Sequence, residues 1–369
     1  MTTSLHDVVV LGGGPAGCAC ALSLRRRWPG LSVAVVEASR YERPRAGEVL
    51  APQAMPLLHQ LGIADAGAAS SLVAQSIASS WGDSALAEHH HLFSAHGFGL
   101  HLDRRAFDLH LAQTTERSGV TLLQGTSFHS AQRDADAWDI EFRGAPSLRA
   151  RFVVDATGRR AAFARSQGVR SEQIDRLTAY SVTMQTQPTA YHTMLIEACE
   201  LGWWYSAPLP HGQRIVSLLT DVDLAREAGL PGLDAWSHHL SRTTHLAALL
   251  AEAYLNEVEV APASAAILKH SGGTGWVATG DAAATYDPLA GQGITKALHT
   301  GILASYVAAE SLMGRETEAR RRYEALLAAN LTGYHRMHQR HYMREARWAG
   351  QPFWQRRRGV HAPLEGVAA

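Results

Sequence analysis

The chain has 369 residues, of which 46% are hydrophobic and 18% are charged, and its formal net charge at pH 7 is +0. This composition is typical of a globular protein of about two domains, and the balanced charge excludes a whole-protein field that would favour nucleic acid or an anionic membrane. The chain has no apolar stretch of about 18 residues, no leader pattern and no disulfide framework among its three cysteines, so we expect a cytoplasmic protein with neither of those partners.

A glycine-rich turn follows the first predicted strand. Residues 7–11 form a short β-branched run, which is typical of a buried parallel strand. In the turn that follows, Gly12 permits the sharp bend, Gly14 lets backbone approach a pyrophosphate, and Gly17 lets the next helix lie close to the strand. The N-terminus of that helix would face the phosphates. The cofactor-binding residues predicted here are Gly12, Gly14, Pro15, Ala16 and Gly17.

An acidic residue ends the second predicted strand, which covers residues 32–36. Glu37 follows Gly17 by 37 − 17 = 20 residues, the spacing expected of an acid that binds the ribose of a dinucleotide. Its carboxylate would accept hydrogen bonds from ribose hydroxyls and repel a 2′-phosphate. The pattern therefore predicts a dinucleotide site that disfavours NADP.

The next part of the chain carries candidate phosphate contacts and a second site fragment. Arg45, in a loop over 43–52, and Arg104, at the start of a helix, are suited to phosphate and ribitol contacts. A buried strand then ends in Asp155-Ala156-Thr157-Gly158, from which Asp155 and Gly158 are predicted to bind the cofactor. The elements predicted here are helices at 53–61 and 102–118, strands and loops over 72–100, and strands at 120–123, 138–142 and 151–154.

The sequence changes character after residue 176, and the periodicity there predicts one antiparallel sheet. Its strands are expected at 177–184, 193–197, 202–208 and 214–220, followed by a helical stretch at 234–253 and a strand at 258–261. We therefore expect an α/β protein in which a substrate domain is inserted into a Rossmann-like FAD-binding domain. The predicted boundaries are 1–75, 100–176 and 269–313 for the FAD-binding domain, 76–99 and 177–268 for the substrate domain, and 314–369 for an arginine-rich helical segment.

A third fragment completes the predicted cofactor site. A strand at 275–279 leads into Gly280 and Asp281, and Asp281 is placed to accept a hydrogen bond from a ribitol hydroxyl. A second glycine-rich turn enters a helix at 293–313, and its amides would stabilise negative charge on a reduced flavin. The three fragments in this order indicate FAD. The cofactor-binding residues predicted in this turn are Pro288, Gly291, Gln292, Gly293 and Ile294.

These residues resemble the flavoprotein monooxygenases of the para-hydroxybenzoate hydroxylase type, whose fold the flavin-dependent halogenases share. The resemblance covers about residues 5 to 310. Its motifs are Gly12/Gly14/Gly17, Glu37, Arg45-Ala46-Gly47, Arg104-x-x-Phe107-Asp108, Asp155-Ala156-x-Gly158 and Gly280-Asp281 with Pro288-x-x-Gly291-x-Gly293.

A finer similarity is to the halogenase-like branch of that family. It is carried by Gly47-Glu48-x-Leu50-x-Pro52, Gly202-Trp203-Trp204-Tyr205-Ser206-x-Pro208 and Asp287-Pro288-Leu289-x-Gly291-Gln292-Gly293. Within that branch the chain looks most like the LodB-type flavoproteins, which are needed to mature a tryptophan-derived quinone cofactor in a partner oxidase.

The resemblance implies an FAD-dependent monooxygenase that hydroxylates an indole through a flavin C4a-hydroperoxide. The substrate it implies is a tryptophan side chain in the precursor of an amino-acid or amine oxidase. Glu48 is then a candidate acid or base, and the backbone of Pro288 and of Gly291 to Gly293 is a candidate for binding the reacting oxygen. Trp203, Trp204 and Tyr205 are candidate substrate contacts, of which at least one must point to the opposite face, because side chains alternate along a strand.

Several alternatives stay open. The substrate could be a free indole or phenol, the reaction could be halogenation or the reduction of a carbon–carbon double bond, and the protein could be a flavin-bound assembly factor. Halogenation is disfavoured because halogenases use a lysine elsewhere, whereas Lys269 and Lys296, the only lysines, lie beside the late motif. Without a second dinucleotide fold, we expect NAD(P)H to bind transiently or a separate reductase to supply electrons.

Histidines and arginines outside these motifs have ordinary interpretations. The histidines at 89–91 lie on a predicted extended loop. His335, His338 and His341 recur every three residues and therefore lie at different angles around a helix. For both groups we predict packing or solvent contact and no metal site. The arginine-rich helix at 316–348 and the aromatic, basic tail at 353–358 would form a solvated face or a docking surface for an acidic partner.

Overall fold

The computed structural model describes residues 4–43, 45–66, 70–186, 193–250 and 257–359. Its first layer is an eight-stranded sheet with the order β19-β20-β11-β1-β2-β8, to which β10 and β9 are joined beside β11. The strands are β1 (Leu5–Leu11), β2 (Val33–Glu37), β8 (Thr121–Gln124), β9 (Ser127–Arg133), β10 (Trp138–Arg143), β11 (Leu148–Asp155), β19 (Gly272–Gly273) and β20 (Trp276–Ala278).

The four central pairings of this sheet are parallel. Both faces of β1 are covered, and Val8, Val9 and Val10 are fully buried, as the uninterrupted hydrophobic run predicts. The carboxyl ends of β1, β2 and β11 therefore meet at one edge of the sheet, where the first two predicted site fragments begin. The predicted strands of this region are confirmed within two or three residues, and β9 was not predicted.

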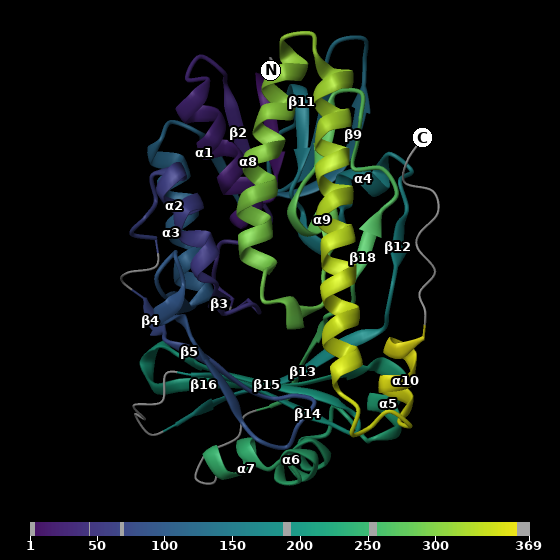
Figure 1. The fold of residues 1–369 in the computed structure, drawn as a ribbon. Helices are drawn as coiled ribbons and strands as arrows, with labels where there is room; N and C mark the ends of the chain where they lie inside the picture. Colours follow the sequence, from purple (N-terminus) through teal and green to yellow (C-terminus); the bar gives the residue numbers. More distant parts are fainter. Residues whose placement is uncertain (1–3, 44, 67–69, 187–192, 251–256, 360–369) are drawn as a thin grey trace.

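Helices pack closely against this sheet (Figure 1). α1 and α8 lie in contact, and a Cβ atom at Gly301 of α8 would come within 2.2 Å of the Ala16 carbonyl oxygen. The small residue at 301 therefore lets α8 approach the start of α1, which brings the first and third site fragments together. The helices around this sheet are α1 (Pro15–Arg27), α2 (Met55–Leu61), α3 (Arg104–Arg117), α4 (Ala162–Ser166), α8 (Gly293–Leu312) and α9 (Glu316–Arg344).

The second layer is a seven-stranded sheet with the order β17-β13-β16-β15-β14-β5-β6. All of its neighbouring strands are antiparallel except β14 and β5, which are parallel. The predicted antiparallel sheet is confirmed, with that one exception. The strands are β5 (Ser76–Ser80), β6 (Ala87–His90), β13 (Leu177–Gln185), β14 (Met194–Cys199), β15 (Gly202–Leu209), β16 (Gln213–Asp221) and β17 (Glu259–Pro262).

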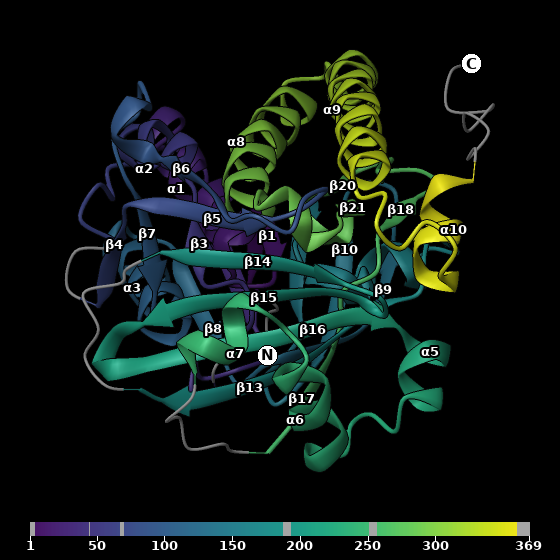
Figure 2. The ribbon, with the colours of Figure 1, turned by 60° about the horizontal axis from the view of Figure 1, so that its bottom comes forward.

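Short helices cover the face of this sheet that points away from the first layer (Figures 1 and 2). The single helical stretch predicted at 234–253 is instead α6 (Leu233–Ser241) and α7 (His245–Leu249), and residues 251–253 lie outside the described residues. α5 (Val222–Glu227) was not predicted. Two small sheets lie between the layers and contain β3 (Val49–Leu50), β4 (Ser71–Ala74) and β7 (Gly99–Leu102), and β12 (Ser171–Gln173), β18 (Ala266–Leu268) and β21 (Ala284–Thr285).

The C-terminal helices connect the two layers. α9 runs beside α8 and continues to the seven-stranded sheet, where α10 (Pro352–Arg358) packs (Figure 1). Phe353 and Trp354 are fully buried, and Trp354 Nε1 donates to the carbonyl oxygen of Cys199 at 2.9 Å. Arg357 is 5% exposed and donates to Asp221 Oδ1 at 2.7 Å. For these three residues of the tail, both predicted interpretations, a solvated face and a docking surface, are wrong.

None of the helices in the described part of the chain is both long and apolar enough to cross a membrane.

Candidate functional site

The first glycine turn is shaped by packing on two sides and is open on the third. Gly12 has φ +110°, and a Cβ atom there would lie 2.1 Å from the Ala156 carbonyl oxygen. A Cβ atom on Gly17 would lie 1.9 Å from the Gly12 carbonyl oxygen, so both positions exclude side chains. Around Gly14, in contrast, Arg45 Nη1 at 3.9 Å is the only atom of the described residues, chain neighbours aside, within 4 Å of an added Cβ. The turn therefore leaves room for a pyrophosphate at the start of α1.

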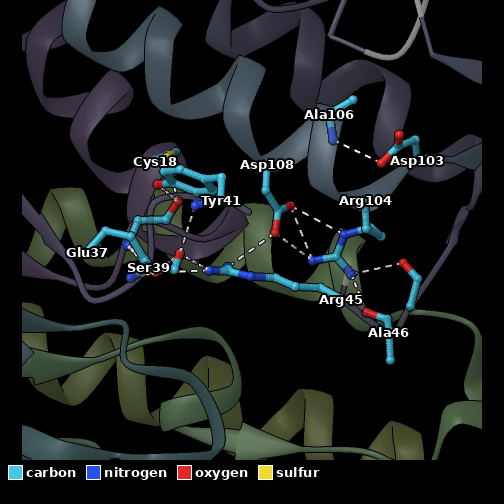
Figure 3. Close-up of polar contacts among 12 residues, drawn as sticks. Cys18, Glu37, Ser39, Tyr41, Arg45, Ala46, Asp103, Arg104, Ala106 and Asp108 are labelled. Carbon is cyan, nitrogen blue, oxygen red and sulfur yellow. Dashed lines mark hydrogen bonds and ion pairs between the residues drawn. The ribbon is translucent and has the colours of Figure 1, made fainter. Parts of the chain in front are cut away.

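Glu37 lies at the end of β2 beside this turn, in a network of polar contacts (Figure 3). Its Oε2 accepts from the Gly13 amide at 2.7 Å, and its Oε1 accepts from Ser39 Oγ at 2.6 Å and Arg45 Nη2 at 2.9 Å. Burial by itself would raise the pKa of the Glu37 carboxyl, but the bonds from Ser39 and the charge of Arg45 lower it below its usual range. Glu37 is therefore ionised at neutral pH and fixed in orientation.

Asp108 joins the two predicted arginines (Figure 3). Its fully buried carboxylate accepts from Arg45 Nη1 at 3.3 Å and from Arg104 Nη2 at 3.1 Å. Arg104 also donates to the carbonyl oxygens of Ala46 at 2.6 Å and Gly47 at 2.9 Å. Asp108 belongs to a sequence motif but was given no role, although its spacing of four residues from Arg104 places both on one side of α3.

The middle fragment forms a turn that its own acid stabilises. Asp155 is fully buried and accepts from the Thr157 amide at 3.0 Å, from Thr157 Oγ1 at 2.6 Å and from the Ala164 amide at 2.9 Å. Burial raises the pKa of the Asp155 carboxyl. Gly158 has φ +65°, and apart from its chain neighbours no atom in the described part of the chain lies within 4 Å of a Cβ added there. The contacts of Asp155 are thus internal to the fold, and a direct contact with the cofactor stays a prediction.

Asp281 is paired with Lys296, which lies beside the late motif in the sequence but was given no role there. Lys296 Nζ lies 2.7 Å from Asp281 Oδ1, donates to the carbonyl oxygen of Ala284 and lies 4.7 Å from the centre of the Tyr286 ring. Burial would raise the pKa of Asp281, but the Lys296 ammonium lowers it below its usual value. The Asp281 side chain is 39% exposed and that of Lys296 only 8%. The Asp281 carboxylate therefore remains accessible to a ligand, while the buried Lys296 ammonium balances its negative charge.

The second glycine turn is held at its start by side chains from α9. Asp287 is 1% exposed, and its Oδ2 accepts from Tyr342 at 2.7 Å and lies 3.2 Å from His338 Nε2. The Asp287 amide donates to Tyr334 Oη at 3.0 Å. Burial would raise the pKa of Asp287, but His338 and Tyr342 lower it below its usual range. His338 therefore contacts the start of the turn, a role that its interpretation as a packing or solvent residue did not include.

Beyond Asp287 the turn faces open space. Pro288, Gly291, Gln292 and Gly293 are exposed, whereas Ile294 is buried beneath them. Gly291 has φ +60°, and beyond the adjoining backbone no atom of the described residues lies within 4 Å of a Cβ added at Gly291 or Gly293. Gly293 begins α8, so this exposed turn coincides with the positive end of the helix dipole. The glycines at both turns thus form a cradle that an elongated anionic dinucleotide such as FAD fits.

Glu48 faces Tyr205 across the contact between the two layers. Glu48 is 7% exposed, its Oε1 accepts from the Gly47 amide at 3.0 Å, and its Oε2 accepts from Tyr205 Oη at 3.5 Å. Burial raises the pKa of the Glu48 carboxyl and raises the pKa of Tyr205 well above its ordinary value. The pair therefore favours the protonated forms, which suits Glu48 to hold a proton.

The three aromatic candidates on β15 point in two directions. Trp204 is fully buried and packs against Trp236 of α6, with ring centres 5.1 Å apart, on the face away from the first layer. Trp203 points to the other face, where its Nε1 donates to Tyr342 Oη at 3.0 Å under the C-terminal helices. These positions do not support substrate contacts by Trp203 or Trp204, because both rings are enclosed in cores. Of the three, Tyr205 alone is incompletely buried.

A cleft of about 520 Å³ opens between the second glycine turn, α8 and α9. Gln292, Lys296 and His299 line one wall, and Tyr334, Met337 and His338 line the other. Tyr334 stacks on Tyr286 with ring centres 4.3 Å apart. The cleft thus has aromatic and imidazole walls and adjoins the turn described above. Among the residues that the structure describes, no group of three or more metal-binding side chains lies together.

Comparison with known proteins identifies the family to which the chain belongs. The family described as FAD binding domain matches residues 6–320. The FAD-dependent oxidoreductase LodB of Marinomonas mediterranea is 28% identical over 366 residues, which cover 97% of this chain and 98% of LodB. The structure of QhpG, named a peptidyl tryptophan dihydroxylase essential for tryptophylquinone cofactor biogenesis, has a TM-score of 0.78 and 26% identity, and the match covers 99% of this chain and 81% of QhpG.

A solved halogenase shows the same fold at lower identity. The myxobacterial chondrochloren halogenase CndH has a TM-score of 0.88 and 20% identity, with 98% of this chain and 87% of CndH covered. The α/β fold predicted from the sequence is therefore confirmed, as is the resemblance to the hydroxylase and halogenase flavoproteins.

Proposed function

We propose that this chain, which belongs to the FAD binding domain family, is a monooxygenase that hydroxylates an aromatic ring. The leading substrate is the indole of a tryptophan side chain in a partner protein, such as the precursor of an amino-acid or amine oxidase. Molecular oxygen, two electrons and two protons would be consumed. One oxygen atom would replace a ring hydrogen as a hydroxyl group, and the other would leave as water.

One observation carries this proposal. The exposed turn from Pro288 to Gly293 ends at the N-terminus of α8, a helix of 20 residues. The backbone amides of the turn and the positive end of the helix dipole are therefore both at an exposed position. FAD, when bound and reduced, supplies the electrons and the site at which oxygen is activated. The turn would stabilise the negative charge of the reduced ring system. A role in redox chemistry therefore suits this turn better than a purely structural one.

The residues of the chain divide the remaining tasks. Gly12, Gly14 and the start of α1 would bind the pyrophosphate, and Glu37 would accept from the ribose. Asp281, balanced by Lys296, would accept from the ribitol. Arg45, with its side chain 31% exposed, is the more accessible of the two predicted arginines, and Arg104, at 11%, would act mainly by holding the loop. These assignments are the contacts that the chain would make along an elongated cofactor.

Glu48 is the proposed proton-holding group. Its raised pKa keeps a proton on the carboxyl at a pH where an exposed glutamate is ionised, and Tyr205 fixes its orientation. We further propose that electrons come from transiently bound NAD(P)H or from a separate reductase. A halogenase role is less favoured, because Lys296 is paired with Asp281 and 8% exposed. A small free indole or phenol remains the alternative substrate.

The test is anaerobic reduction of the FAD-loaded protein followed by rapid mixing with oxygen and a tryptophan-containing peptide. We expect a transient absorbance before the oxidised flavin spectrum returns, and one added oxygen atom in the peptide by mass spectrometry. Direct reoxidation that yields only hydrogen peroxide, with both peptides and free indoles, would contradict the oxygenase proposal. Failure of the purified chain to bind FAD would contradict its premise.

A further inference from the structure

The arginines of the C-terminal segment fall into two groups. Arg347, Arg356 and Arg357 form ion pairs with Glu345, Asp221 and Asp223. Arg336, Arg340 and Arg344 are exposed on α9, and within the described residues none of these three forms a salt bridge. We call these three the basic stripe. The stripe therefore presents three positive charges that no salt bridge among the described residues neutralises.

The basic stripe lies beside the cleft. Residues four apart on a helix differ by about 40° around its axis, so Arg336, Arg340 and Arg344 share one side of α9 and span about 12 Å. Met337 and His341, which line the cleft, follow Arg336 and Arg340 by one residue and lie about 100° further round, on the neighbouring side. The stripe therefore flanks the cleft wall. Tyr334, His338 and Tyr342 continue round the helix to face the second glycine turn.

One wall of the cleft presents an accessible apolar side chain. The Met337 side chain is 48% exposed at the wall next to the stripe. Thioether side chains adapt to the shape of flat aromatic partners and contact them favourably. Tyr286 and Tyr334 offer stacked rings farther in. The cleft thus suits an aromatic ring, while the adjoining side of α9 suits carboxylates.

We propose that the basic stripe docks an acidic segment of the polypeptide substrate and that the adjoining cleft receives its tryptophan side chain. This inference rests on the proposed function and specifies its substrate. A free indole fills only the cleft, whereas a polypeptide reaches both the cleft and the stripe. The exposed cleft-lining residues, including Gln292, His299 and Asn330, leave an entrance for a side chain carried on a backbone.

The test uses the FAD-loaded full chain and a fluorescent synthetic peptide with acidic residues around a single tryptophan. A second peptide replaces the acidic residues with glutamine. Arg336→Gln, Arg340→Gln and Arg344→Gln are combined in one variant. The control variant combines Arg105→Gln, Arg143→Gln and Arg321→Gln, which removes the same charge from exposed positions elsewhere. Fluorescence anisotropy reports binding without turnover.

We expect the stripe variant to bind the acidic peptide about tenfold more weakly at low salt, with the difference shrinking at high salt, and the control variant to bind it normally. Oxygenation of a free indole should be unchanged in both variants. Equal weakening in both variants, or equal binding of the acidic and glutamine peptides, would overturn the inference. So would an anionic single-stranded oligonucleotide that binds the stripe more tightly than the acidic peptide does.

The two proposals fail in different ways. If neither variant nor wild type oxygenates any indole while the acidic peptide still binds through the stripe, the proposed chemistry is wrong and the docking surface stands. If free indole is oxygenated but the stripe variant binds the acidic peptide as tightly as wild type does, the docking inference alone is wrong.

Discussion

Two glycines three positions apart in the first turn have different surroundings. A Cβ atom on Gly17 would collide with the Gly12 carbonyl oxygen at 1.9 Å, whereas the nearest atom that a Cβ atom added to Gly14 would meet among the described residues beyond its chain neighbours is Arg45 Nη1, at 3.9 Å. The first position is therefore constrained by the fold itself. The second position is constrained by any ligand that occupies the space in front of it.

We expect Gly14→Val to fold normally and to bind FAD at least about tenfold more weakly, because its side chain occupies the space proposed for the pyrophosphate. Quenching of FAD fluorescence measures the affinity, and thermal unfolding measures the fold. Gly17→Ala is the contrasting variant and should lower the melting temperature even without cofactor. A Gly14→Val protein that retains FAD would show that the loop has been placed wrongly.

Glu48 gives a prediction about pH. Burial raises its pKa in the folded protein, so the folded state holds a proton that the unfolded state has released. Stability should therefore fall as pH rises from the ordinary glutamate range through the raised pKa. A folded-state pKa that lies one pH unit above the unfolded-state pKa changes the free energy of unfolding by about 1.4 kcal/mol across that range.

We expect Glu48→Gln to melt close to wild type at acidic pH and to become relatively more stable as pH rises, while losing activity. Melting curves across a pH series measure this difference. Tyr205→Phe, which removes the hydrogen bond to Glu48 but keeps the carboxyl, should retain the pH dependence. A constant difference between Glu48→Gln and wild type at all pH values would mean that folding does not shift the pKa of Glu48.

At the scale of elements, α9 sets the position of the second glycine turn. Tyr334, His338 and Tyr342 are spaced by four residues and therefore lie along one side of the helix, where all three contact Asp287. Tyr342 also accepts from Trp203 Nε1 of β15. One hydroxyl group thus connects the turn, the long helix and the seven-stranded sheet.

Tyr342→Phe removes the hydrogen bonds of the Tyr342 hydroxyl to Asp287 and Trp203, and it leaves the Asp287 carboxylate with one hydrogen-bond donor fewer. We expect a loss of about 1–3 kcal/mol in the free energy of unfolding, and weaker FAD binding if the turn moves. Chemical denaturation and FAD titration measure the two effects. Gln339→Ala, at an exposed position on the same helix, is the control. Unchanged stability of Tyr342→Phe would mean that water replaces the hydroxyl.

The elements themselves were largely predictable because local patterns determine them. A β-branched run followed by glycines predicted β1 and α1, and the change of character after residue 176 predicted the strand at 202–208, which is β15. Contacts between distant elements were not predictable. Asp287 and Tyr342 are 55 residues apart, and nothing in either local sequence indicates the other. The Lys296–Asp281 ion pair was not predicted for the same reason, because it depends on how α8 packs against the turn that precedes it.

At the scale of the whole molecule, α10 joins the end of α9 to the second sheet. Trp354 is fully buried among Trp81, Tyr342 and Phe353 and donates to Cys199. The basic composition of this tail suggested exposure, because composition does not reveal that Asp221 and Asp223 lie opposite its arginines.

We expect Trp354→Ala to lower the free energy of unfolding by about 3–5 kcal/mol, because it opens a cavity between α10 and the sheet. FAD should also be retained less well, since the same cavity borders Tyr342. Thermal unfolding with and without FAD measures both. Gln355→Ala, an exposed neighbour on α10, should match wild type. A Trp354→Ala protein of normal stability would show that α10 is not required to hold α9.

The pairing of β1 with β11 and of β11 with β20 has a consequence for biosynthesis. The central strand of the first sheet pairs with a strand more than 130 residues later, and that strand pairs with another more than 110 residues after it. A nascent chain emerging from the ribosome therefore cannot close this sheet until most of the polypeptide has been translated. Because α9 emerges later still, the complete cofactor pocket should form only after α9 has left the ribosome, and the unpaired strands are exposed to aggregation until then.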